Sequence, residues 1–161
     1  MISRRVRALG ELLPGEGELG YFCITGANDS VLRAVGEAKM RGNMALSEQI
    51  KAIFNRYLTK YFVDFELTVP RGRGSDSFMI RTWRGDARFV TCFDFDTPLD
   101  VAHDWRSRLG KYPTISVTVD VKDRWIVLLD DVMTTGSTMA GHLLALLRAG
   151  ANATALVLTR R

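Results

Sequence analysis

The sequence predicts an α/β fold with three layers (α/β/α), in which helices cover both faces of a mostly parallel central sheet. Two apolar runs of strand length, residues 125–129 and 153–159, flank a helical stretch at residues 137–149. A strand, a crossover helix and a second strand form a βαβ unit, whose two strands are parallel. Strands and helices also alternate along most of the chain, as is typical of α/β proteins.

The N-terminal part is expected to be largely helical. Residues 30–58 are mostly helix-forming and are interrupted at Gly42-Asn43, which predicts two helices. The second helix carries apolar residues at helical spacing, and we expect these to form its packing face. They are Ala45, Leu46, Ile50, Ile53, Phe54 and Leu58.

The middle of the chain predicts three more strands and a short helix. Residues 63–69 alternate apolar and polar up to Pro70, which indicates a half-buried strand. Residues 88–93 and 114–121 are further strand candidates, the latter with its isoleucine and valines on one face, and residues 99–109 are a helix candidate. Gly150 stands where a glycine ends the last helix.

Length and composition exclude several classes of protein. The chain has 161 residues, 47% hydrophobic and 25% charged, with a net charge of +4, so we expect one globular domain rather than a disordered, collagen-like or coiled-coil chain. Its two cysteines, Cys23 and Cys92, form no CxxC pair, which excludes a disulfide framework and a cysteine-rich zinc module and favours a reducing, cytoplasmic location. Neither a membrane span nor a secretory signal is expected.

Residues 130–138, DDVMTTGST, hold the side chains best suited to chemistry, because they follow a strand where α/β sheets bind ligands. Asp130 and Asp131 can accept hydrogen bonds from vicinal hydroxyls or hold a hydrated cation. The remaining residues supply hydroxyls, a glycine and backbone N–H groups at a helix N-terminus, which suits a phosphate monoester. These phosphate-binding candidates are Thr134, Thr135, Gly136, Ser137 and Thr138.

A ribose 5-phosphate therefore fits this segment, with its diol on the acids and its phosphate on the loop. One alternative interpretation of residues 130–138 is an ordinary strand-to-helix turn, in which Ser137 or Thr138 caps the helix. Another is a Walker B strand, which requires a GxxxxGK[ST] partner that the chain lacks.

The segment IVLLDDVMTTGSTM closely resembles the phosphoribosyl pyrophosphate motif of type I phosphoribosyltransferases. The resemblance implies the fold of that family and a pentosyltransferase of nucleotide metabolism. Ribose 5-phosphate would move from phosphoribosyl pyrophosphate to an acceptor base or amine with release of pyrophosphate, and Asp130 and Asp131 would act as the catalytic residues. Mg²⁺ would enter through substrate oxygens and water, so no residue is assigned as a direct metal ligand.

The chain is also similar to the ComF family, a competence-associated group of phosphoribosyltransferase-like proteins. The similarity lies in LRAVGEAKMRGNMALSEQI, with Lys39, Arg41 and Gly42, and in DFELTVP and LLRAGANATALVLTRR. The usual four-cysteine zinc module of that family is absent, and no stretch with arginine and asparagine is evident in residues 94–122. Within one domain, 1–161, the resemblance implies an N-terminal helical hood at residues 1–61 and a core at residues 62–161.

In type I phosphoribosyltransferases, the loop after the first core strand grips pyrophosphate. Here that loop is VPRGRGSDS, so Arg71, Gly72 and Arg73 are the pyrophosphate candidates. An ordinary solvated turn is the alternative for this loop.

A binding protein without transferase activity is the rival hypothesis, and single-stranded DNA is then an open partner. Each of the three tryptophans stands beside an arginine, an arrangement that suits single strands, although we expect Trp83 and Trp105 to cover the core and Trp125 to begin a buried strand. His103 and His142 are expected to be surface or capping groups. The expected assembly is a homodimer, and the acceptor substrate stays open.

Overall fold

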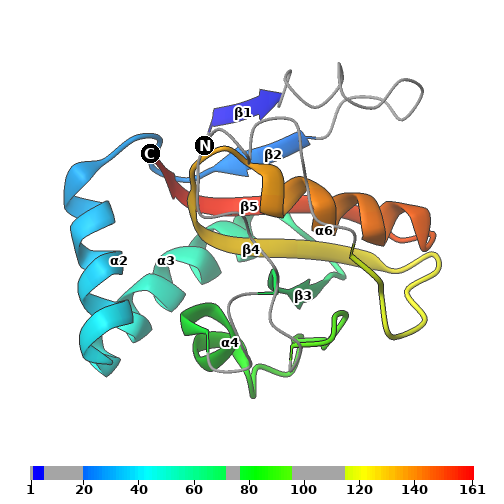
Figure 1. Ribbon diagram of the computed structural model, residues 1–161, viewed down its shortest axis with the longest axis horizontal. Helices are drawn as coiled ribbons and strands as arrows, with labels where there is room; N and C mark the ends of the chain where they lie inside the picture. Colours follow the sequence, from blue (N-terminus) through cyan, green and yellow to red (C-terminus); the bar gives the residue numbers. More distant parts are fainter. Residues whose placement is uncertain (1, 6–19, 72–76, 96–114) are drawn as a thin grey trace.

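The computed structural model describes residues 2–5, 20–71, 77–95 and 115–161 of the chain. These residues form five strands and four helices. In chain order, and with the labels of Figure 1, they are β1 (Ile2–Arg5), β2 (Gly20–Cys23), α2 (Asp29–Arg41), α3 (Met44–Tyr61), β3 (Glu66–Thr68), α4 (Phe78–Trp83), β4 (Trp125–Met133), α6 (Ser137–Arg148) and β5 (Asn152–Arg160).

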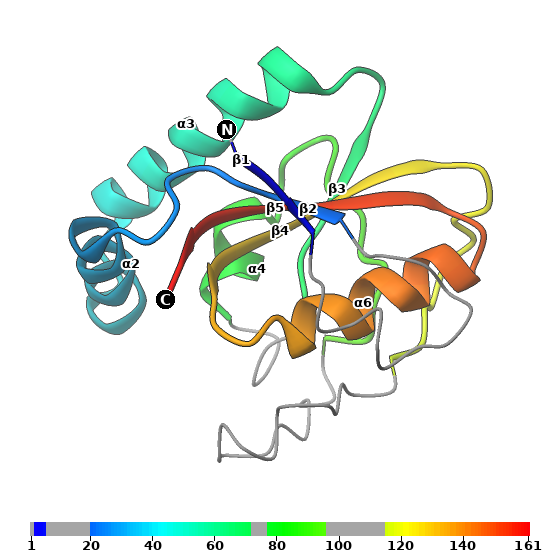
Figure 2. The ribbon, with the colours of Figure 1, turned by 90° about the horizontal axis from the view of Figure 1, so that it is seen from above.

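The five strands form one sheet in the order β1-β2-β5-β4-β3. Strands β2, β5, β4 and β3 are parallel, and β1 is added at one edge antiparallel to β2. Figure 2 shows α3 and α6 on opposite faces of this sheet. The predicted α/β class with a mostly parallel sheet is therefore confirmed, and β1 and β2 show that the N-terminal part contributes strands to the sheet as well as helices.

The core lies around β4 and β5. Residues 126–129 of β4 and 155–158 of β5 are all buried, because helices cover the sheet on both faces. The predicted βαβ unit is confirmed in β4, α6 and β5. At its far end, Gly150 adopts φ 86° and the chain closes α6 with two hydrogen bonds, from Gly150 N to Leu147 O and from Ala151 N to Leu146 O. This Schellman pattern confirms the predicted role of Gly150.

The two N-terminal helices are separated as predicted. Gly42 adopts φ 60°, and the side chains of Asn28 and Asn43 cap α2 and α3. Ile50, Phe54 and Leu58 form the buried face of α3. Ala45 and Ile53 were expected on that face but are exposed, which shows that the face is narrower than the apolar pattern of the sequence.

The predictions for the middle of the chain were partly wrong. Strand β3 is limited to Glu66–Thr68, because Asp64 adopts φ 51° and turns the chain, leaving Val63 exposed. Thr68, expected on the wet face, is buried and donates its hydroxyl hydrogen bond to Val90 O. The strand is thus covered on both faces rather than half-buried.

Residues 88–93 and the described part of 114–121 are not strands. They form only isolated bridges, Leu67 with Phe89 and Phe93 with Val117. Alternation of apolar residues indicates burial on one side, but a strand also needs a continuous partner, which these segments lack within the described part of the chain. The short helix α4, capped by Ser77, was not predicted. The helix expected at residues 99–109 lies outside the described residues, as do Trp105 and His103.

Candidate functional site

The acid pair lies at the carboxyl end of β4, an interior strand between β5 and β3. We expected the strand to end at residue 129, but β4 continues to Met133, and the connection to α6 comprises only residues 134–136. Asp130 is paired with Val157 of β5, so the backbone of the pair is held by the sheet itself. The acids therefore stand on a rigid element, close to the N-terminus of α6.

Asp131 forms an ion pair with Lys39 of α2. Lys39 Nζ lies 2.7 Å from Asp131 Oδ1, and the Asp131 side chain is only 5% exposed whereas that of Lys39 is 42% exposed. Figure 1 shows α2 beyond the ends of β4 and β5 where the C-terminus lies, which explains how a residue of the N-terminal part reaches the acid. Lys39 neutralises a carboxylate that would otherwise be buried alone.

Lys39 was not predicted as a site residue. It appeared only in the stretch that resembles the ComF family, and no sequence pattern relates it to an acid 92 positions away. The Lys-x-x-Gly spacing was the one available signal, and it gave no indication of the partner.

Asp130 is half-buried and accepts a hydrogen bond from Asp131 N at 3.0 Å. Burial and the neighbouring Asp131 carboxylate raise the pKa of Asp130 to about 7, against the opposing effects of Lys39 and of that backbone hydrogen bond. The raised pKa favours the neutral form of Asp130 relative to that of an exposed aspartate. Asp130 can therefore either accept or donate a hydrogen bond at a sugar hydroxyl.

The phosphate-binding candidates lie at the turn into α6. Gly136 is the N-cap residue with φ 81°, a conformation that L-residues with a side chain rarely adopt. The N-cap residue is Gly136, which has no side chain, so neither Ser137 nor Thr138 is the N-cap residue that the ordinary-turn alternative required. The hydroxyl of Thr135 accepts a hydrogen bond from Ser137 N at 3.4 Å. The hydroxyls of Thr135 and Ser137 lie 3.0 Å apart, while Thr134 is exposed.

Arg71 is the described part of the predicted pyrophosphate segment, since Gly72 and Arg73 lie outside the described residues. It follows β3 and Pro70, and its backbone N–H donates to Nε2 of His142 over 2.8 Å. His142 was expected at the surface or as a cap, and this was wrong because its side chain is fully buried in α6. Its Nδ1 lies 2.6 Å from Thr138 O, so the ring connects the Arg71 backbone to the first turn of α6.

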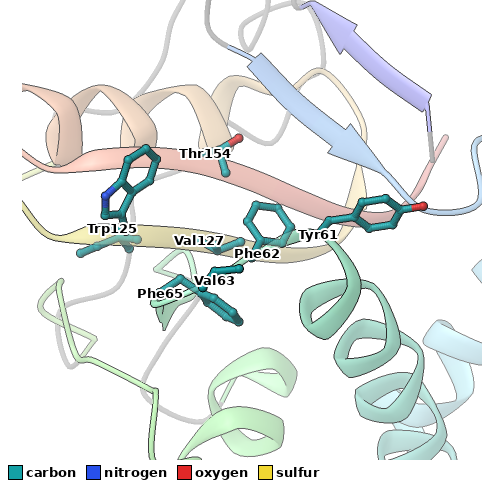
Figure 3. Close-up of a pocket in the computed structure, with 8 residues that line it drawn as sticks. Tyr61, Phe62, Val63, Phe65, Trp125, Val127 and Thr154 are labelled. Carbon is teal, nitrogen blue, oxygen red and sulfur yellow. The ribbon is translucent and has the colours of Figure 1, made fainter.

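The opposite end of the sheet carries a small apolar hollow of about 200 Å³. Figure 3 shows its lining side chains between the end of α3 and the beginnings of β4 and β5. They are Tyr61, Phe62, Val63, Phe65, Trp125, Ile126, Val127 and Thr154. Trp125 begins the buried strand β4 as predicted, but its own side chain is 64% exposed. Trp83 is buried in the core. This hollow contains none of the sequence-predicted site residues.

The donor set at the acid pair limits how a metal ion can bind. Among the described residues, no three His, Cys, Asp or Glu side chains are grouped to hold a metal ion. Asp130 and Asp131 alone fit a magnesium ion that arrives with phosphate oxygens and water already bound. Within the same residues, no helix combines the length and the apolar character needed to cross a membrane.

The chain was compared with protein-family models and with curated proteins. A scan against protein-family models gave no match to this chain. A search of curated proteins gave none either.

Proposed function

We propose that the protein binds phosphoribosyl pyrophosphate and transfers its ribose 5-phosphate group to a base or amine, releasing pyrophosphate. One observation carries this proposal. At the carboxyl end of the interior strand β4, two acids are followed within a few residues by a left-handed glycine that is the N-cap residue of α6. A diol acceptor and a phosphate cradle thus lie one short turn apart.

Each part of the ligand has a matching group in the site. Asp130 and Asp131 would accept hydrogen bonds from the two ribose hydroxyls. The turn at residues 134–138 would hold the 5-phosphate through its N–H and hydroxyl groups. The segment at Arg71 would face the pyrophosphate, as the resemblance implies. Mg²⁺, bound through the substrate, would supply positive charge to the leaving pyrophosphate.

Catalysis in this arrangement comes from positioning and electrostatics. As the bond from the sugar carbon to pyrophosphate breaks, positive charge develops on the ribose ring. The two acids hold the ring by its hydroxyls and place negative charge close to it. Lys39 limits the net negative charge of the pair, so the site also tolerates an anionic ligand.

A binding protein without transferase activity is the second candidate. The observation in its favour is that one acid of the pair is already engaged by Lys39. His142 does not fill that role because its ring is fully buried and both of its nitrogens are engaged.

Isothermal titration calorimetry with phosphoribosyl pyrophosphate and Mg²⁺ tests the site. We expect the wild type to bind, and the double variant Asp130→Asn/Asp131→Asn to lose at least about 100-fold in affinity, since the amides carry no charge and the buried Lys39 contact is weakened. The variant Asp123→Asn is the matched control, because it makes the same substitution at an exposed turn next to the other end of β4. Unchanged affinity in the double variant would overturn the proposed site.

Two assays separate the two candidates. Release of pyrophosphate in the presence of a panel of bases and amines supports the transferase. Filter binding of single-stranded DNA, titrated with salt, supports the binding protein if the affinity falls steeply as salt rises. Ligand binding without pyrophosphate release from any acceptor would favour the second candidate.

A further inference from the structure

The His142 ring joins two segments that the proposed function assigns to opposite ends of one ligand. Arg71 begins the predicted pyrophosphate segment, and its N–H donates to Nε2 at 2.8 Å. Thr138 ends the predicted 5-phosphate segment, and its carbonyl oxygen lies 2.6 Å from Nδ1. The two segments are 67 positions apart in sequence, from 71 to 138, and this ring lies between them.

The two contacts fix the protonation of the ring. Because Nε2 accepts the Arg71 N–H, it carries no proton, and the single proton of the neutral ring is on Nδ1, where it donates to Thr138 O. Burial lowers the pKa of His142 to about 4, and the charge of Arg71 acts in the same direction. The ring therefore stays neutral at neutral pH and remains able to accept.

Packing holds the ring in this orientation. His142 is fully buried, and its ring stands edge-on to Phe93, with centroids 4.6 Å apart and an interplanar angle of 89°. A rotation that broke the bond to Arg71 would also disturb this aromatic contact. The histidine thus behaves as a fixed spacer anchored on α6.

We propose that His142 is a positioning residue, which holds the Arg71 segment at a set distance from the 5-phosphate turn. This inference rests on the proposed function. Phosphoribosyl pyrophosphate carries its phosphate and its pyrophosphate on a single sugar, so the two anion-binding segments must be correctly spaced before both can engage. His142 acts through the backbone of Arg71 and does not itself touch the ligand.

A comparison of two ligands tests the proposal. Ribose 5-phosphate has the diol and the 5-phosphate but lacks pyrophosphate, so it does not depend on the Arg71 segment. In His142→Phe the ring volume and the contact with Phe93 remain, while the acceptor for Arg71 N is lost. We expect calorimetry to show about a tenfold loss of affinity for phosphoribosyl pyrophosphate, because Arg71 N is no longer held by His142, and less than about a twofold change for ribose 5-phosphate.

Two polar variants provide the matched control. Glutamine places its side-chain oxygen near the position of Nε2, whereas asparagine is one carbon shorter and reaches only the position of Nδ1. His142→Gln should therefore regain most of the affinity for phosphoribosyl pyrophosphate, and His142→Asn should not. This pair keeps the test decisive if His142→Phe fails to fold.

The possible outcomes distinguish a failure of the proposed function from a failure of the positioning role of His142. A wild type that binds neither ligand overturns the proposed function. If the wild type binds both ligands and every His142 variant weakens them by the same factor, the function stands but His142 is merely structural. A selective loss for phosphoribosyl pyrophosphate that glutamine reverses supports the positioning role.

Discussion

The two ends of the same parallel strands are built from similar backbone but hold charge in different ways. Helix α6 has a left-handed glycine at each end, Gly136 near the acids and Gly150 at the opposite end. At Gly150 the last carbonyls of the helix are satisfied by the following N–H groups, whereas the N-cap residue Gly136 has no side chain to cap the beginning of the helix. The carboxyl end of the sheet thus presents a positive helix terminus for a ligand, while the amino end is closed on itself.

The ion pairs at the two ends of the sheet differ in how deeply their acidic side chains are buried. Lys39 pairs with an Asp131 side chain that is 5% exposed. At the amino end, Arg124 pairs with Glu66, and both side chains are about one-third exposed, 34% and 36%. Charges that are held in the core must be neutralised by a partner, whereas those in water need none. Burial of charge therefore distinguishes the candidate site from the structural end.

The largest expected effect is on the pH dependence of stability, and it belongs to the carboxyl end. The pKa of His142 is lowered to about 4 in the folded state, against about 6.5 when unfolded. As the pH falls below 6.5, the unfolded chain takes up a proton that the folded ring refuses, so stability is lost until the pH reaches about 4. The loss approaches about 3 kcal/mol.

Urea unfolding of the wild type and of His142→Phe between pH 8 and pH 4 measures this effect. The difference between the two proteins isolates the histidine, because Asp130, whose pKa is raised, contributes equally to both and with the opposite sign. The wild type should lose stability relative to the variant over this range. Parallel curves would show that the ring titrates normally.

The second-largest effect on stability is expected when the basic residue of each ion pair is replaced, which compares the two ends of the sheet directly. Lys39→Met leaves the buried Asp131 carboxylate without its partner, and we expect a loss of about 2 kcal/mol at pH 8. Arg124→Met removes a pair that water already screens, so its loss should stay below about 1 kcal/mol. Chemical denaturation at low salt provides both numbers. Equal losses would mean that burial does not distinguish the two pairs.

Replacement of each glycine is the third comparison. Gly136→Ala and Gly150→Ala each force a side chain into a left-handed conformation, which should cost about 1 kcal/mol of stability. The cost should be no smaller at Gly150, where the added Cβ would lie 3.3 Å from Lys122 Cγ. Only Gly136→Ala should also lower the affinity for ribose 5-phosphate, by about tenfold, because it disturbs the turn that is proposed to bind the phosphate. Thermal unfolding and calorimetry on the two variants check this difference. A similar loss of affinity in Gly150→Ala would indicate a general effect on the fold.

The smallest effect is expected at the apolar hollow. Trp125 is 64% exposed, so Trp125→Ser should change stability by less than about 0.5 kcal/mol and should leave ligand affinity unchanged. The same denaturation and calorimetry experiments measure it. A marked loss of affinity would show that the two ends of the sheet are coupled.

The elements predicted correctly from the sequence are those whose signal is local. Strands β4 and β5 and helix α6 are specified by continuous apolar runs, helix-forming residues and one C-terminal glycine, all within forty positions of one another. Segments 88–93 and 114–121 have similar apolar alternation, but whether they form strands depends on a neighbour. Among the described residues, the first segment has two isolated bridges and the second has one. Periodicity reports which side of a segment is buried and not what it pairs with.

In the candidate site too, contacts between residues that are distant in sequence could not be predicted. The diacid and the following turn form a contiguous motif, so their proximity could be predicted, although the extent of β4 could not. Lys39 meets Asp131 from 92 positions away, and His142 meets Arg71 from 71 positions away. Neither contact has a local signature, because a lone lysine or histidine on a helix is most often at the surface. Only the fold brings these pairs together.

The position of β5 between β2 and β4 has a consequence for how the chain acquires its structure. The hydroxyl of Thr25, just after β2, bonds to the carbonyl of Leu158 in β5, and these residues are 133 positions apart. During synthesis, β2 therefore has no place in the sheet until β5 has been made. Such non-local pairing gives a high contact order, for which folding is slow and early strands stay open to wrong partners.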